Sequence, residues 1–485
     1  MRQDMGKSRE RPVIMNSGFC RASFHTRFRW GLASGREGPF GEGLVFMRLI
    51  HLAATVFLPT FGSARKYFSS IAIDSPRPSR SPHCPHIVVG ITSPQTCLVL
   101  GGRLRSLREA GFRVTLVASP GALLARTAAQ QGVESIAIPI HRGIAPLADL
   151  VSLARLCQLL YRLKPDMTEF STPKAGLLGS IAAMLCGVPA RVYFLRGLKL
   201  ESCTGIKRRM LLAAERLASA CSHTVLCNSD SLRYEAIALR VAPASKLRLL
   251  GCGSSNGVDV ERFQPGPSDL RERLGLAPDA PVIGFVGRLT CDKGLPELIE
   301  AFDAILVAKP EAHLLLVGWF DASEDALGSD LRSRIKNNPH IHTTGFVADT
   351  APYYRVMDVM VLPTWREGFP NVVLEAAATG IPVVTTLSTG SRDAVLPEVT
   401  GLLIPPGYPV AIRESVLKLL RNPERRRRMG AAARCWVLEH YVNGQVLGLT
   451  VRYYQGLLCQ KLQGDLKIGP LSDDSVLNSI QKIYG

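Results

Sequence analysis

The stretch EGFPNVVLE, residues 367–375, carries two glutamates eight positions apart and is the most informative part of this chain. It follows the apolar, strand-like run DVMVLP at 358–363 and leads into an alanine-rich stretch that ends at Gly380. The order strand, turn, helix places both carboxylates at the carboxyl edge of a parallel sheet, where open α/β folds bind ligands. A carboxylate at the start of a helix is a rigidly held acceptor for sugar or ribose hydroxyls. The spacing alone is weak evidence, because a solvated turn residue and a surface helix residue give the same pattern.

A second loop with candidate binding residues, GRLTCDKG at residues 287–294, follows the apolar run VIGFV. Arg288 and Lys293 bracket this loop, and a helix is expected to begin near Leu295. Backbone N–H groups and the helix dipole at such a terminus attract an anion. The guanidinium grips two phosphate oxygens and the ammonium adds a point charge. Two solvated basic residues are the alternative interpretation, but together with the glutamates the loop predicts a pocket for a nucleotide diphosphate sugar.

Strand-like and helix-like segments alternate along most of the chain, which predicts doubly wound parallel sheets. The first strand is expected at 86–92, and a helix is expected over 98–110 with Gly101-Gly102 inside it. The turn-rich stretch NGVDVERFQP at 256–265 interrupts the alternation before a second cycle begins. The chain is therefore expected to be an α/β protein with two Rossmann-like domains. Their expected bounds are 85–265 and 266–440, followed by a closing helix and tail at 441–485.

The first 84 residues differ from the rest of the chain. They are rich in Arg, Ser, Gly and Pro without sustained periodicity, so most of them are expected to be disordered. An apolar patch over 44–61 is interrupted by Arg48, His51 and Pro59, and a membrane-spanning helix needs roughly 20 apolar residues. The patch is either an interfacial segment or upstream sequence read from an early start codon, with Met47 as the alternative start.

Composition narrows the class of protein. Apolar residues make up 46% and charged residues 20% of the chain, as in soluble globular proteins. The 12 cysteines include no Cys-x-x-Cys pair, which favours reduced thiols in a cytoplasmic protein over a disulfide framework or a zinc site. The net charge of +18 divides into +8 for residues 1–85, +11 for 86–262 and −1 for 263–485. The basic first half favours an anionic membrane or lipid phosphate as partner; no nucleic-acid-binding module is recognisable.

Four motifs together resemble glycosyltransferase family 4, whose members have the two-domain GT-B fold and retain anomeric configuration. The motifs are the phosphate loop, the Glu-x7-Glu pair, the NGVD linker and the loop GSRD at 390–393. The resemblance is strong from about 282 to 420, looser across 86–265, and does not include residues 1–84. It implies a glycosyltransferase without specifying its donor or its acceptor.

The resemblance also implies roles for individual residues. Arg288 and Lys293 would bind the donor diphosphate and stabilise it as the leaving group. Glu375 would accept hydrogen bonds from the ribose hydroxyls, and Glu367 would hold the transferred sugar together with the turn that follows it. The remaining implied donor contacts are that turn, Gly368, Phe369, Pro370 and Asn371, and the backbone of Gly345, Phe346 and Val347 at the base.

Two departures from the family pattern concern the first domain. Many relatives carry a His-Gly pair near the reacting sugar, where this chain has Arg196-Gly197. Arg196 is therefore a candidate for contact with the donor or with an anionic acceptor. The alternative interpretation is a purely structural role. Relatives often carry glycines in the first strand–helix loop, where this chain has Ser93, Gln95 and Thr96. Both differences lie on the side of the molecule expected to bind the acceptor.

The leading interpretation is a retaining glycosyltransferase that works by front-face substitution, without a protein nucleophile, a cofactor or a metal ion. It would move a sugar from a nucleotide donor, with UDP favoured, to a glycan or polyprenyl-diphosphate-linked acceptor in surface polysaccharide or glycolipid assembly. One alternative is a nucleotide-sugar 2-epimerase of the same fold, which would need no acceptor. The other is a non-catalytic nucleotide-sugar-binding scaffold protein.

A basic and apolar helix start in the first domain indicates where such an enzyme meets its membrane. Lys207, Arg208 and Arg209 stand beside apolar Met210 and the two leucines that follow it. A helix of this kind can lie on an anionic bilayer, so peripheral association with the inner face of the cytoplasmic membrane is expected. A solvated helix face is the alternative interpretation.

Overall fold

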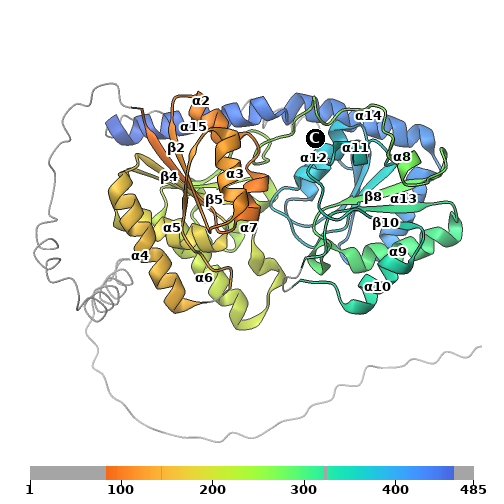
Figure 1. Cartoon of the computed structure of the whole chain (residues 1–485), viewed down its shortest axis with the longest axis horizontal. Helices are drawn as coiled ribbons and strands as arrows, with labels where there is room; N and C mark the ends of the chain where they lie inside the picture. The colour runs from red at the N-terminus through yellow and green to blue at the C-terminus, as the bar shows by residue number, and fades with distance from the viewer. Residues whose placement is uncertain (1–83, 144, 322–324, 464–485) are drawn as a thin grey trace, which may run out of the picture. The chain divides into compact units, whose positions relative to one another are not determined.

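The computed structural model describes residues 84–143, 145–321 and 325–463. These residues form two parallel β-sheets, of seven and six strands, within one compact unit (Figure 1). The predicted α/β fold with two Rossmann-like domains is therefore confirmed. The expectations of disorder and of an interfacial segment concern residues that lie almost wholly outside the described part of the chain.

The first sheet has the strand order β3-β2-β1-β4-β5-β6-β7. Its strands are β1 (His86–Gly90), β2 (Arg113–Ala118), β3 (Glu134–Ala137), β4 (Met167–Ser171), β5 (Ala190–Leu195), β6 (Thr224–Cys227) and β7 (Leu247–Leu249). The connecting helices are η2 (Pro94–Val99), α2 (Arg103–Glu109), α3 (Ala122–Gln131), α4 (Pro146–Leu163), α5 (Pro173–Leu185), η3 (Lys199–Ser202), α6 (Gly205–Cys221), α7 (Asp230–Ala238) and η4 (Ala244–Lys246). Every residue of β1 and β4 is buried, as expected for central parallel strands that are covered on both faces.

The second sheet has the strand order β10-β9-β8-β11-β12-β13. Its strands are β8 (Val282–Val286), β9 (His313–Val317), β10 (Ile341–Thr343), β11 (Val359–Leu362), β12 (Val383–Thr386) and β13 (Gly401–Ile404). Its helices are α8 (Leu270–Arg273), η5 (Cys291–Lys293), α9 (Leu295–Ala308), α10 (Ser329–Asn337), α11 (Ala351–Tyr354), α12 (Asn371–Ala378), η6 (Arg392–Ala394), α13 (Pro409–Leu420) and α14 (Pro423–His440).

Each sheet reverses its winding direction once, and this positions the candidate site. In the first sheet β1 lies between β2 and β4, and in the second sheet β8 lies between β9 and β11. Loops that leave such neighbouring strands diverge, which opens a crevice at the carboxyl ends of the strands. The loop after β8 carries Arg288 and Lys293, and the loop after β11 carries Glu367. Both loops that carry predicted site residues therefore flank the switch point of the second sheet.

The first helical segment is shorter than the sequence pattern predicts. Instead of one helix over 98–110, η2 ends at Val99 and α2 begins at Arg103. Gly101 between them has a φ of +52°, and a Cβ there would lie 3.3 Å from the Asn256 side chain. Asn256 in turn donates from Nδ2 to the carbonyl oxygen of Val99 at 2.5 Å. Gly101-Gly102 therefore belong to the first strand–helix loop, so the glycines that seemed missing from this loop are present further along it.

The last described helix, α15 (Asn443–Gln463), leaves the second domain and packs on the first (Figure 1). Tyr454, Leu457 and Leu458 join the apolar core beneath α2. Arg103 of α2 donates to Glu169 of β4 with an Nη2···Oε2 distance of 2.8 Å, and Tyr454 Oη donates to the same oxygen at 2.6 Å. A buried ion pair needs such additional partners to offset its desolvation, so this contact fixes α15 in place.

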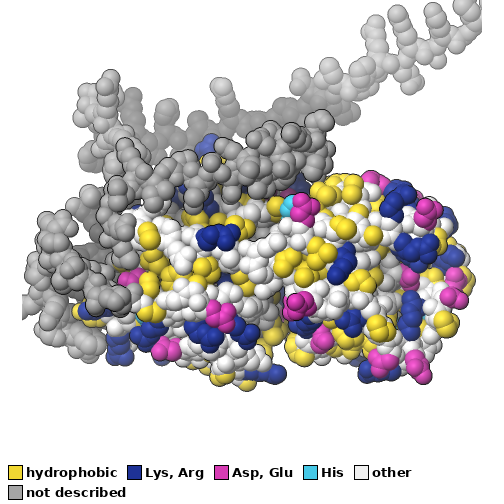
Figure 2. All heavy atoms as spheres, turned by 90° about the horizontal axis from the view of Figure 1, so that it is seen from above, with side chains coloured by type: hydrophobic (Ala, Val, Ile, Leu, Met, Phe, Trp, Pro, Cys, Tyr) yellow, Lys and Arg dark blue, Asp and Glu magenta, His cyan; other side chains and the backbone are white. Residues whose placement is uncertain are grey.

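The surface of the second domain agrees with its nearly neutral charge. On the face shown in Figure 2, Lys and Arg side chains (dark blue) and Asp and Glu side chains (magenta) are interspersed over the right half of the molecule. A mixed surface of this kind produces no strong field of one sign.

Candidate active site

The phosphate loop of the second domain holds its arginine between two aspartates. Arg288 follows β8 and Gly287, and donates from Nη1 to Asp321 Oδ2 at 2.7 Å. Its Nη2 lies 3.7 Å from Asp292 Oδ2. The guanidinium is about one third exposed, so part of its edge faces solvent. These aspartates orient the guanidinium and partly neutralise it, and a phosphate that binds here has to compete with them.

The central contact of the site joins the phosphate loop to the first glutamate. Lys293 Nζ lies 2.5 Å from Glu367 Oε1, and the two side chains are 15% and 17% exposed. The contact is possible because β8 and β11 are neighbours, which brings their carboxyl-end loops together. Gly294 allows the two loops to approach each other closely, because its φ is +74° and a Cβ there would lie 2.1 Å from the carbonyl oxygen of Pro363. The predicted phosphate-binding cation and the predicted sugar-binding carboxylate therefore occupy one site.

The second glutamate lies one helical turn into α12. Glu375 accepts a hydrogen bond at Oε2 from the hydroxyl of Tyr354, at 2.8 Å. Burial raises the pKa of Glu375 to about 7, although the hydrogen bond from Tyr354 and the charge of Arg262 act in the opposite direction. A hydroxyl group that donates to this carboxylate would favour its ionised form.

An aromatic pair stands at the carboxyl ends of β9 and β10, where the base was predicted to bind. Trp319 and Phe346 meet edge to face, with ring centroids 5.7 Å apart, and Phe346 is 56% exposed. Gly345 has a φ of +69°, and Val347 packs against the core. Analysis of the sequence missed Trp319, although its place directly after the strand-like run HLLLVG was the signal that could have identified it.

Three residues of the turn after Glu367 have structural contacts or roles. Phe369 is 7% exposed and packs against Tyr441, with ring centroids 5.5 Å apart. Pro370 is the N-cap residue of α12, and Asn371 accepts at Oδ1 from Ser254 Oγ at 3.1 Å. These contacts set the position of the turn.

The two domains meet at glycines of the site. A Cβ at Gly368 would lie 1.9 Å from the carbonyl oxygen of Arg196, and a Cβ at Gly390 would lie 2.3 Å from the carbonyl oxygen of Gly368. Ser231, at the start of α7, donates its backbone N–H to Asp393 Oδ2 at 3.0 Å. The GSRD loop of the second domain and the Arg196 region of the first therefore enclose the turn after Glu367.

Comparison with known proteins identifies the class of this site. The family described as "Glycosyl transferases group 1" matches residues 280–422, and the "Glycosyl transferase 4-like domain" matches residues 100–253. The capsular polysaccharide biosynthesis glycosyltransferase CapM of Staphylococcus aureus is 36% identical over 343 residues, which cover 70% of this chain and 89% of CapM. The chain belongs to the family 4-like glycosyltransferases.

Two further comparisons extend this assignment. The UDP-Gal:alpha-D-GlcNAc-diphosphoundecaprenol alpha-1,3-galactosyltransferase of Escherichia coli is 30% identical over 272 residues, 54% of this chain and 68% of that enzyme. The crystal structure of Anabaena HepE with UDP and glucose has a TM-score of 0.63 at 20% identity, covering 76% of this chain and 99% of HepE. This structural likeness shows the GT-B fold. The prediction of a glycosyltransferase is confirmed, and the epimerase and scaffold alternatives are not favoured.

The first-domain loop of the glycosyltransferase forms a small polar cluster. Ser93 caps η2, where its Oγ accepts from the Gln95 backbone at 3.3 Å and its carbonyl accepts from the Thr96 N–H at 2.9 Å. Arg142 donates to Ser93 Oγ at 2.6 Å and to Gln95 Oε1 at 3.3 Å. Sequence analysis missed Arg142, which lies in a loop without a recognisable motif.

Arg196 is placed where the first domain touches the turn after Glu367. Its guanidinium carbon lies 4.3 Å from the centroid of the Phe194 ring. Within the described residues, its Nε and Nη2 atoms are buried and have no hydrogen-bond partner. The backbone carbonyl of Arg196 is the part of this residue that lies next to Gly368.

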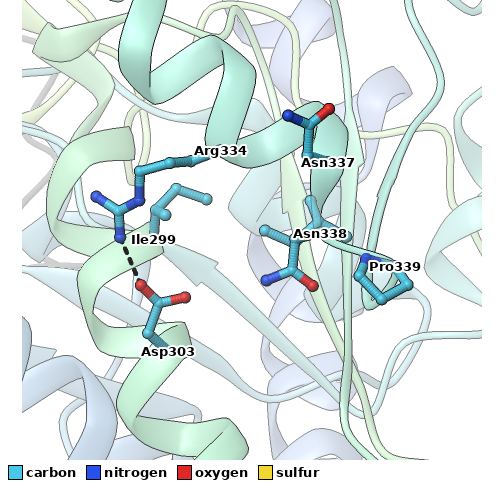
Figure 3. Close-up of a pocket in the computed structure, with 7 residues that line it drawn as sticks. Ile299, Asp303, Arg334, Asn337, Asn338 and Pro339 are labelled. Carbon is cyan, nitrogen blue, oxygen red and sulfur yellow. Dashed lines mark hydrogen bonds and ion pairs between the residues drawn. The ribbon is translucent and has the colours of Figure 1, made fainter.

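Other features of the described chain lie apart from this site. A cavity of about 350 Å³ lies between α9, α10 and β10, and the Arg334–Asp303 ion pair crosses its wall (Figure 3). No predicted site residue lines it. Among the residues that the structure describes, no group of three His, Cys, Asp or Glu side chains is arranged to hold a metal ion, and no helix has the length and apolarity to cross a membrane.

Proposed function

We propose that this glycosyltransferase moves a sugar, with retention of anomeric configuration, from a UDP-sugar to a glycan or polyprenyl-diphosphate-linked acceptor in surface polysaccharide or glycolipid assembly. The contact between Lys293 and Glu367 carries the proposal, because it joins a phosphate-binding cation to a hydroxyl-binding carboxylate at a topological switch point. The capsular polysaccharide glycosyltransferase CapM and the Escherichia coli galactosyltransferase support the biological role, and the structures of HepE with UDP and UDP-glucose support the donor.

In the proposed reaction, the bond between the anomeric carbon and the β-phosphate oxygen breaks as the acceptor hydroxyl attacks the same face of the sugar. The proton of that hydroxyl passes to the departing diphosphate. Arg288 and Lys293 stabilise the negative charge that develops on the diphosphate, so neither a protein nucleophile nor a metal ion is needed. Glu367 holds the sugar hydroxyls, and the ribose hydroxyls donate to Glu375.

The base is proposed to lie against the second domain at the carboxyl ends of β9 and β10. The backbone of Gly345–Val347 supplies hydrogen-bonding groups, and Trp319 with Phe346 offers aromatic surface for stacking. Base–aromatic stacking tolerates different bases, whereas backbone hydrogen bonds distinguish them. This division places discrimination between UDP and GDP in the backbone of the loop after β10.

The first domain is proposed to bind the inner face of the cytoplasmic membrane through α6. Ile206 and Met210 of this helix are 79% and 52% exposed, and Lys207 and Arg209 between them are exposed as well. Apolar side chains inserted among basic ones bind anionic lipid surfaces. Flotation with phosphatidylglycerol vesicles tests this: Lys207→Glu with Arg209→Glu should abolish co-flotation, while Arg334→Glu in α10 should not. Unchanged flotation of the double variant would remove α6 from the proposal.

A thermal-shift titration with UDP, GDP, ADP and their sugar conjugates tests the donor assignment. A ligand that binds only the folded state raises the melting temperature. UDP is expected to stabilise the wild type, and Glu375→Ala should weaken the shift. Addition of EDTA should leave the UDP shift and the transfer activity unchanged. If no nucleotide shifts the wild type at millimolar concentration, the donor site is assigned wrongly.

A further inference from the structure

Arg196, the residue directly after β5, has a hydrogen-bonding edge that nothing in the described chain uses. Its Nε and Nη2 atoms are buried without a partner. These two nitrogens lie along the same edge of the guanidinium plane, which is an edge that arginine presents to paired oxygens of a phosphate or carboxylate. Arg103 uses the same two atoms to hold Glu169, at 3.2 and 2.8 Å. Leaving such a buried donor pair unsatisfied costs free energy, and a bound ligand that accepts from both nitrogens would offset this cost.

The charges around Arg196 do not balance. Arg103 and Arg196 are both close to Glu169, the one carboxylate that acts on Arg196. Oε2 of Glu169 already accepts from Arg103 and Tyr454, and Oε1 has no partner in the described residues. Burial, together with the charge of Arg103, lowers the pKa of Arg196 to about 10, which leaves it protonated at neutral pH. One positive charge is therefore in excess here, and an anion would compensate it.

The backbone of Arg196 lies beside the turn proposed to hold the transferred sugar. The carbonyl oxygen of Arg196 would be 1.9 Å from a Cβ at Gly368, and a Cβ at Gly197 would lie 3.3 Å from the Gly368 nitrogen. Asn228, whose Nδ2 would be 3.0 Å from a Cβ at Gly368, also has an unpaired buried Oδ1. The ring of Phe194 supports the guanidinium plane at 4.3 Å. These contacts place the backbone of Arg196 at the edge of that turn and its guanidinium against the Phe194 ring.

We propose that Arg196 binds a phosphate group of one reactant through its Nε–Nη2 edge, from the first domain and opposite Arg288 and Lys293. This inference rests on the proposed function, because that function places a diphosphate next to the transferred sugar. The phosphate belongs either to the nucleotide donor or to a lipid-diphosphate acceptor, and both present the same oxygens to the guanidinium. Arg196 thus contributes phosphate recognition on the side of the site where many family members carry histidine.

Calorimetric titration of the full chain with UDP, uridine, farnesyl diphosphate and farnesol tests the proposal. Arg196→Met should weaken binding of at least one phosphate-bearing probe by about 10-fold or more, as expected for lost hydrogen bonds between charged groups. Arg196→Lys should recover part of the affinity, because it keeps the charge without the paired donors. Arg248→Met, an exposed arginine on β7 of the same sheet, is the matched control and should bind like the wild type.

The pattern of affinities distinguishes the sources and the failures. If Arg196→Met loses affinity for UDP, Arg196 binds the donor phosphate; if it loses affinity for farnesyl diphosphate, Arg196 binds the acceptor phosphate. The affinities for uridine and farnesol should be unchanged. Wild-type affinity of Arg196→Met for both phosphate probes overturns this inference and leaves the proposed function standing. If the wild type binds neither probe, the donor assignment and the inference fail together. If Arg196→Met does not fold, Arg196→Lys and Arg196→Gln provide the same comparison.

Discussion

At the scale of single residues, the proposed function gives Lys293 two anionic partners. Lys293 contacts Glu367 at 2.5 Å in this structure, and a bound diphosphate would draw on the same ammonium group. Lys293→Met should therefore lower kcat/KM by about 100-fold or more, the usual cost of removing one group that stabilises developing charge. Steady-state transfer assays measure this.

Lys309→Met provides the matched control, because Lys309 forms an exposed ion pair with Glu311 at 3.3 Å, at the end of α9. Such pairs contribute at most about 1 kcal/mol to stability, so activity should be unchanged. Equal activity of Lys293→Met and wild type would contradict the role assigned to Lys293.

Glu375 should make UDP binding depend on pH. Its pKa is raised from 4.5 to about 7 in the folded protein, so between these values the folded state holds a proton that the unfolded state has lost. Its contribution to stability is therefore largest at low pH and falls as pH rises toward 7. Ribose hydroxyls prefer the ionised form, so UDP affinity should rise roughly tenfold from pH 6 to pH 8. Glu375→Gln should flatten the pH dependence of stability and that of UDP affinity. If the UDP affinity of this variant, measured by calorimetry, varies with pH as in the wild type, Glu375 is not the origin of the pH dependence.

At the scale of elements, the close approach of two loops requires a glycine. Gly294 combines a φ of +74° with a Cβ position 2.1 Å from Pro363 O, whereas Gly275 has a φ of +67° and nothing within 4 Å. Gly275→Ala should therefore show only the cost of the backbone conformation, about 1 kcal/mol. Gly294→Ala should cost more and also weaken UDP binding, because the loop of Lys293 has to move away from Glu367. Urea unfolding and UDP titration measure the two effects; equal stability losses would show that the steric contact relaxes freely.

Elements also show where local patterns mislead. The apolar periodicity of 98–110 predicts one helix, but Gly101 turns the chain into the left-handed region and makes room for Asn256, which is more than 150 residues away. Glycine is the residue that tolerates this conformation, so the pair Gly101-Gly102 was the available signal. Conversely, the loops after β8 and β11 follow directly from strand–turn–helix patterns, and they are where the sequence places them.

At the scale of the whole molecule, α15 ties the end of the described chain to the first domain through a buried ion pair. Arg103 and Glu169 are 1% and 0% exposed, and Tyr454 of α15 donates to Glu169. Arg103→Met removes the cation that hydrogen-bonds to this buried carboxylate and leaves only the charge of Arg196 nearby, so the free energy of unfolding should fall by up to about 3–5 kcal/mol. Tyr454→Phe removes a hydroxyl that donates to Glu169 at 2.6 Å and accepts from Arg103 Nη2 at 2.9 Å, so it should cost about 1.5–3 kcal/mol, the value of hydrogen bonds to charged groups.

Urea denaturation measures these losses, and Arg113→Met is the control on the same sheet. Arg113 pairs with Glu134 at 3.1 Å, but both side chains are more than half exposed, so its loss should cost at most about 1 kcal/mol. A similar loss for Arg103→Met and Arg113→Met would mean that the buried pair does not hold α15 in place.

The α/β class, the two-domain organisation and the loops that carry Arg288, Lys293 and Glu367 follow from the sequence alone, because strand periodicity and turn residues are local properties of the chain. The folded structure was needed to show that Lys293 contacts Glu367, that Tyr454 reaches Glu169 and that the Arg196 edge has no partner among the described residues. The first two contacts join residues 74 and 285 positions apart. Their distances depend on strand order and on the path of α15, which long-range packing sets and no local pattern encodes.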